Sequence, residues 1–156
     1  MLSPGLALEA VIADTRDHPI TPDDTGLYTV TRHIELLCQL AAHTAAETEN
    51  QLAPNSADLP PAKALALGTG HLGKAIAHYT QTLIPLLYLP AAKEETEQQR
   101  WLVAEHRGAL QIHLNGARTA LADAHALLSP PPAPAPVGPA ASAPAPPHTP
   151  GPRSRS

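Results

Sequence analysis

Histidine is the residue type in this chain whose number and spacing most invite chemistry. Nine histidines occur among 156 residues, eight of them before residue 130. Within one predicted helix, His71 and His78 are seven residues apart, which is about 10.5 Å along the axis and too far to share a metal ion. Chelating pairs on one helix normally sit four residues apart. A metal site would therefore have to combine histidines from different helices.

Such a combination exists if the chain reverses near residues 55 and 90. His43, His71 and His106 then fall at one height on three helices, with Glu47 one turn from His43 as a fourth ligand or an orienting group. The apolar rows of these helices place the three rings beside the core rather than inside it, which is typical of boundary histidines. We therefore predict no metal site and no cofactor, and keep these four residues as the candidate ligands of the alternative.

A glycine-rich segment offers the second chemical hypothesis. Gly68-Thr-Gly-His-Leu-Gly73 matches G-x-G-x-x-G, and Lys74 follows it as in a phosphate-binding loop. Both motifs need a preceding strand, but residues 62–67 are Ala, Lys and Leu, and Ala75 stands where magnesium binding needs Ser or Thr. The pattern favours a helix in which small residues admit a close neighbour, with fraying or bending over residues 68–73.

Nucleophilic catalysis has little support. Cys38 lies beside an apolar row in Leu36-Leu37-Cys38-Gln39-Leu40, so we expect a buried structural thiol. With one cysteine in the chain, neither a disulfide framework nor a four-cysteine zinc site can form. We assign no catalytic residue and predict that the protein is not an enzyme.

The groups named above lie on three long predicted helices. These helices are predicted because apolar residues recur every three or four positions. The predicted spans are 22–52, 61–89 and 90–129, preceded by a short helix over 4–14 with Ser3 as its cap. Thr21 would cap the second helix, Pro22 and Pro90 would occupy first turns, and Pro85 predicts a kink or an early end. Their apolar rows are Leu27, Val30, Ile34, Leu37 and Ala41; Leu65, Leu72, Ile76, Tyr79, Leu83 and Leu86; and Val103, Leu110, Leu114, Ala117, Leu121, Ala124 and Leu128.

Short connections force neighbouring helices to run antiparallel. The predicted fold is all-α: an up-down-up bundle of three long helices (22–129), a short N-terminal helix with its connector (1–21) and a disordered tail (130–156). Eleven of the 19 prolines fall in that tail, which cannot bury apolar area and favours polyproline II. Its P-x-x-P spacings offer a docking segment for a protein partner.

Charge and composition narrow the function. The net charge is −4, and residues 1–129 carry eight basic against fourteen acidic residues, which argues against nucleic acid as a partner. The longest apolar run, residues 83–89, is too short to cross a membrane, and the start resembles no secretory signal, so a cytoplasmic location is expected.

The leading hypothesis is a non-enzymatic interaction or accessory protein with an unidentified protein partner. One alternative is a metal- or small-ligand-binding bundle that uses His43, His71 and His106. A second alternative is a DNA-associated regulatory factor. A homodimer is also expected if the fourth helix overhangs its neighbours and exposes Leu121 and Leu128.

Overall fold

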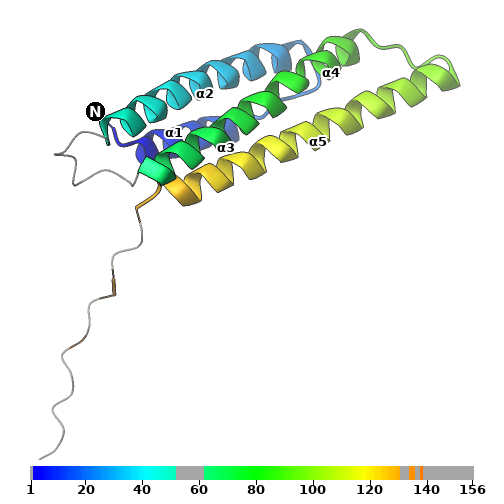
Figure 1. The fold of residues 1–156 in the computed structure, drawn as a ribbon. Coiled ribbons are helices and arrows are strands. Elements are labelled where there is room, and N and C mark those ends of the chain that lie inside the picture. The colour runs from blue at the N-terminus through cyan, green and yellow to red at the C-terminus, as the bar shows by residue number, and fades with distance from the viewer. Residues whose placement is uncertain (1, 52–61, 131–133, 136–137, 139–156) are drawn as a thin grey trace, which may run out of the picture.

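Three long antiparallel helices dominate the protein, as Figure 1 shows for a computed structural model of the chain. The structure describes residues 2–51, 62–130, 134–135 and 138, and within these residues there are helices but no strand. The elements are α1 (Pro4–Asp17), α2 (Asp24–Asn50), α3 (Ala62–Gln81), α4 (Leu83–Tyr88), the 3-10 helix η1 (Leu89–Ala91) and α5 (Glu97–Leu128). The predicted all-α, up-down-up bundle is confirmed. The predicted tail lies almost entirely outside the described residues.

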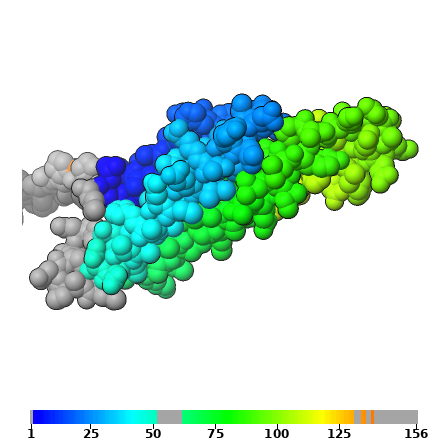
Figure 2. Space-filling view, turned by 90° about the horizontal axis from the view of Figure 1, so that it is seen from above, coloured from blue at the N-terminus to red at the C-terminus, as the bar shows by residue number. Residues whose placement is uncertain are grey.

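The helix α3 lies in the middle of the bundle and packs against both α2 and α5. The short α1 contacts α2 and α5, so it closes one side of the bundle over part of its length. Figure 2 shows that one end of the bundle, formed by α4 and the start of α5, extends past α1 and α2. The bundle is therefore thicker at the α1 end than at the α4 end.

Side-chain caps set where three of the helices begin. The Ser3 hydroxyl accepts a hydrogen bond from the N–H of Leu6, as predicted for the first helix. The second helix begins later than predicted, because Asp23 caps it by accepting from the N–H groups of Thr25 and Gly26. Thr21, the predicted cap, instead donates its hydroxyl proton to Asp23 at 2.8 Å.

The last helix also begins later than predicted, at Glu97 instead of Pro90. Thr96 and Gln99 form a capping box, in which the Thr96 hydroxyl accepts from the N–H of Gln99 and the Gln99 side chain accepts from the N–H of Thr96. This reciprocal pair satisfies two helix-end donors that would otherwise lack partners. Pro90 belongs to η1, and residues 92–96 connect η1 to α5, which runs antiparallel to α3.

The predicted interruption by Pro85 occurs four residues earlier, where α3 ends at Gln81. A proline has no N–H to donate to the carbonyl four residues before it, and its ring crowds that carbonyl. The Thr82 hydroxyl donates to the carbonyl of Tyr79 at 2.6 Å, which closes the last turn of α3. The helix then resumes as α4 after this single residue.

The predicted apolar rows form the core. Leu37, Leu72 and Leu110 are buried, and Ile76 and Leu114 are partly buried against the same cluster. In α2 the buried side is turned slightly from the predicted one. It comprises Gly26, Val30, His33, Leu37, Leu40 and Thr44.

This turn of α2 overturns the expectation for the cysteine. Cys38 is exposed, because the buried side passes through Leu37 and Leu40 and leaves position 38 facing outward. The basis for a homodimer also changes, since Leu121 and Leu128 are buried within the chain. The part of α5 that overhangs is its N-terminal end, where Trp101 is exposed.

Candidate functional site

The structure does not bring the three candidate metal-ligating histidines together. The Nε2 of His43 lies 3.4 Å from the carbonyl of Leu2, and the Nδ1 of His71 lies 3.7 Å from the carboxylate of Asp123. His106 instead stacks on Tyr88, with 4.2 Å between ring centroids. Each imidazole thus has a neighbour of its own.

The late start of α5 separates His71 from His106. Because His71 is level with Asp123, and His106 lies 17 residues before Asp123 on the same helix, the two rings differ in height by about 25 Å. Glu47 remains one turn from His43 on α2. In the described part of the chain, no three His, Cys, Asp or Glu side chains are grouped so that they could hold a metal ion.

A different histidine pair does meet across two helices. His78 on α3 and His113 on α5 approach to 3.5 Å between their Nδ1 atoms. Gly116 makes room for this contact, since a Cβ there would lie 2.5 Å from the His78 ring. Two imidazoles without a third ligand give a half-buried polar contact between two helices and not a metal centre of the usual kind.

The glycine motif lies inside a continuous helix, so the predicted fraying is wrong. Residues 68–73 all belong to α3, and the residues before them form its first turns instead of a strand. Their N–H groups lie within a helical segment and so are not presented together to a phosphate. The expected close neighbour is found at Gly68 only, where a Cβ would lie 2.7 Å from the buried Leu128 side chain.

A cavity of about 840 Å³ lies between α1 and α5. The last turns of α1 and the connector residues Pro19 and Ile20 form one wall, and residues 111–125 of α5 form the other. His33 from α2 and Tyr79 from α3 complete the lining. The cavity thus lies alongside α1 from Glu9 to Arg16, between that helix and α5.

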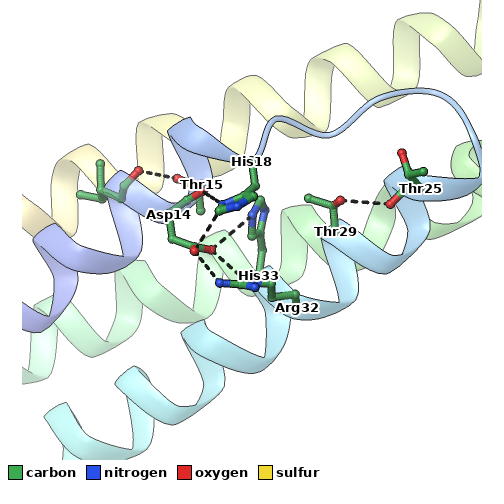
Figure 3. A network of polar contacts seen from close by, with 8 residues as sticks. Asp14, Thr15, His18, Thr25, Thr29, Arg32 and His33 are labelled. Atoms are coloured by element: carbon green, nitrogen blue, oxygen red, sulfur yellow. Dashed lines mark hydrogen bonds and ion pairs between the residues drawn. The ribbon is translucent and has the colours of Figure 1, made fainter.

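His33 is the most unusual residue of this cavity. Its side chain is 1 % exposed, yet neither ring nitrogen makes a hydrogen bond within the described structure. Its Nε2 lies 3.9 Å from Asp14, whose carboxylate is engaged by Arg32 at 2.7 Å (Figure 3). Burial lowers the pKa of His33 from its ordinary value, while the nearby Asp14 carboxylate opposes that shift. The ring is therefore held neutral at pH 7.

Tyr79 lies beside His33 in the lining. The two rings meet edge to face, with 5.6 Å between their centroids, and Tyr79 is 6 % exposed. Burial raises the pKa of the Tyr79 phenol, while Arg118 and a hydrogen bond with Thr15 oppose that rise. The phenol therefore keeps its proton at neutral pH and can donate it in a hydrogen bond.

Sequence reasoning placed Tyr79 in the core but missed His33. The signal was present, because His33 lies three residues after Val30 and four before Leu37, so the same face of α2 carries all three. A histidine in a row of aliphatic residues is the pattern that would have singled it out.

Comparison of the chain with protein-family models, curated proteins and solved structures gave no match. The geometry of the described residues therefore carries the functional argument. Among those residues, no helix combines the length and the apolar character that crossing a bilayer requires.

Proposed function

We propose that this chain is a non-enzymatic interaction protein whose bundle binds a protein partner through the α2–α4 end. The supporting observation is an apolar surface formed by Tyr28, Ile84, Leu87 and Pro90, which we call the tip patch. The side chains of Tyr28 and Leu87 are 79 % and 63 % exposed, and Ile84 lies one turn before Leu87. Tyr28, Leu87 and Pro90 surround a hollow of about 390 Å³.

Clustering distinguishes the tip patch from other exposed apolar residues. Scattered surface leucines are normal, whereas neighbouring large apolar side chains around a hollow are typical of interaction sites. Fully burying one side chain of this size stabilises a complex by about 1.5–3 kcal/mol. Tyr28 and Leu87 together would therefore contribute about 3–6 kcal/mol, and the rest of the interface must help to offset a cost of association of about 4–15 kcal/mol. Asp24 is a charged neighbour at the edge of the hollow.

The location of the proposed activity is the cytoplasm. The exposed free thiol of Cys38 supports this, because such a thiol persists best in a reducing compartment. The partner is either another protein or a second copy of this chain, and one pair of variants distinguishes these outcomes.

The test replaces Tyr28 and Leu87 by serine in the full chain and uses Leu67→Ser with Ile112→Ser as the matched control. Both pairs remove two exposed apolar side chains, so both should keep the helical circular dichroism spectrum. Affinity purification with mass spectrometry should recover a protein with the wild type and the control that Y28S/L87S fails to recover. Sedimentation velocity should show a dimer lost only in Y28S/L87S if the partner is a second copy.

The proposal is wrong if Y28S/L87S keeps the same partners and the same mass as the wild type. It is also wrong if the control pair loses the partner equally, because the tip patch would then have no special part in binding.

A further inference from the structure

We infer that the cavity between α1 and α5 binds a small organic acid, in which a carboxylate is attached to an apolar body. This site is separate from the tip patch and does not depend on the function proposed for it. Three features of the cavity carry the inference: its apolar walls, a buried histidine whose ring nitrogens make no hydrogen bond, and two arginines that form no ion pair among the described residues.

The walls and the volume fit the apolar body. Ile12, Ile20, Leu114 and Leu121 supply aliphatic surface from both sides of the cavity. The volume of about 840 Å³ lies within the usual range for small-molecule sites, which is roughly 300–1,000 Å³. An inorganic anion would leave these walls unused, so the ligand must carry a hydrocarbon or aromatic part.

His33 supplies the second observation. Almost every buried polar side chain in a folded protein has a hydrogen-bond partner, and an exception calls for an explanation, such as a catalytic role, local strain or a bound group. His33 is such an exception, since both ring nitrogens lack a hydrogen bond although the side chain is 1 % exposed. A neutral imidazole has one donor and one acceptor nitrogen. Both His33 nitrogens are closed to solvent in the structure, and the Nε2 lies 3.9 Å from Asp14, so a ligand oxygen can accept from the ring once a side chain of the lining moves aside.

The charges select an acid over an amine. Arg16 on α1 and Arg118 on α5 both line the cavity and are exposed, and among the described residues neither forms an ion pair. Arg118 donates only to the side-chain oxygen of Asn115, at 3.1 Å. The acidic residue of the lining, Glu9, lies 3.2 Å from His125. A guanidinium binds a carboxylate through two parallel hydrogen bonds, which explains why a carboxylate suits this site.

The test titrates the full-length protein with octanoate by isothermal titration calorimetry, using 1-octanol and acetate as matched probes. Octanoate should bind at one site per chain, 1-octanol at least about tenfold more weakly because it lacks the charge, and acetate not measurably because it lacks the apolar body. Equal affinities for octanoate and 1-octanol, or no binding of octanoate, would overturn the inference.

Paired variants locate the binding site. Arg118→Gln should weaken octanoate binding about tenfold or more, whereas Arg100→Gln removes an exposed arginine from the same helix outside the cavity and should leave it unchanged. Ala122→Trp places an indole in the cavity and should abolish binding, while Ala104→Trp, at an exposed alanine of α5 outside the lining, should not. If both members of a pair behave alike, octanoate binds elsewhere and the assignment fails.

A readout on the wild-type protein keeps the inference testable if Ala122→Trp does not fold. The NMR signals of the His33 ring should shift on addition of octanoate, and those of His43, which lies outside the lining, should not. Saturable binding without a His33 shift would contradict the site. The Y28S/L87S pair should bind octanoate like the wild type, so this site and the tip patch can fail independently.

Discussion

Replacing the three glycines of α3 by alanine one at a time should change stability in opposite directions. A Cβ at Gly70 or Gly73 would meet nothing within 4 Å, so the substitution changes only the backbone. A Cβ at Gly68 would lie 2.7 and 2.8 Å from two carbons of Leu128, which is itself buried. The three positions share one helix and one motif, and they differ in what the new methyl group would touch.

The magnitudes follow from two opposing effects. Alanine is favoured over glycine in a helix interior by about 1 kcal/mol, so Gly70→Ala and Gly73→Ala should each stabilise the protein by about that amount. Gly68→Ala gains the same helix preference but overpacks a filled site, which costs about 1–3 kcal/mol. The net result at Gly68 should be a loss of about 1 kcal/mol, roughly 2 kcal/mol below the other two variants.

Urea unfolding followed by circular dichroism measures these differences. In a body of this size, about 1 kcal/mol corresponds to a change of about 4 °C in Tm, and the thermal scan provides an independent check. Equal effects at all three positions would refute the packing argument. A loss of stability at Gly70 and Gly73 would mean that these glycines are needed for a backbone shape other than the helix of the structure.

The remaining predictions concern pH, a cap and a packed glycine. Stability should fall as the pH drops below about 6.5, by up to about 1.4 kcal/mol per pH unit from His33, because burial lowers its pKa and the unfolded chain then binds a proton that the folded chain does not. Asp14 opposes this shift of the pKa, and His18 and Arg32 reinforce it. In urea unfolding between pH 5 and 8, the stability of His33→Leu should depend less steeply on pH than that of the wild type. Thr96→Ala should lower stability by about 1 kcal/mol through loss of the capping box, whereas removal of a hydroxyl within α3, by Thr80→Ala, should change it by less than half of that in the same thermal scan. Gly26→Ala should destabilise the protein more than Gly68→Ala does, because a Cβ at position 26 would overlap the backbone carbonyl of Thr21 instead of a side chain. A smaller loss of stability in urea unfolding would count against the close approach of Thr21 to Gly26.

The fold could be predicted because apolar spacing and helix stop signals are local properties of the sequence. The rows through Leu37, Leu72 and Leu110 identified three amphipathic helices, and prolines marked where helices end. Such rows do not determine the buried side of a helix to within one position, because partly buried residues flank the core on both sides. Cys38 was misplaced for that reason.

The relative height of two helices was harder to predict, because it depends on the length of the connection between them. The T-x-x-Q pattern at Thr96 and Gln99 is a capping-box signal, and it moves the start of α5 seven residues beyond the predicted Pro90. Each residue added to a connection displaces the next helix against its neighbour. That displacement separates His106 from His71 and brings His78 next to His113.

The candidate cavity depends on an even less local property, namely where a short helix ends relative to two long ones. The α1 helix ends at Asp17, and the chain then passes through Pro19 to reach the start of α2. The groove between α2 and α5 is therefore covered by side chains of α1 along one part and by a non-helical connector along the next. The cavity runs alongside α1 from Glu9 and continues past the end of the helix to Pro19 and Ile20, and His33 lines it because α2 is turned to bury that face. Three elements distant in sequence thus define the site, whereas the residues that sequence spacing favoured for chemistry lie elsewhere on the bundle.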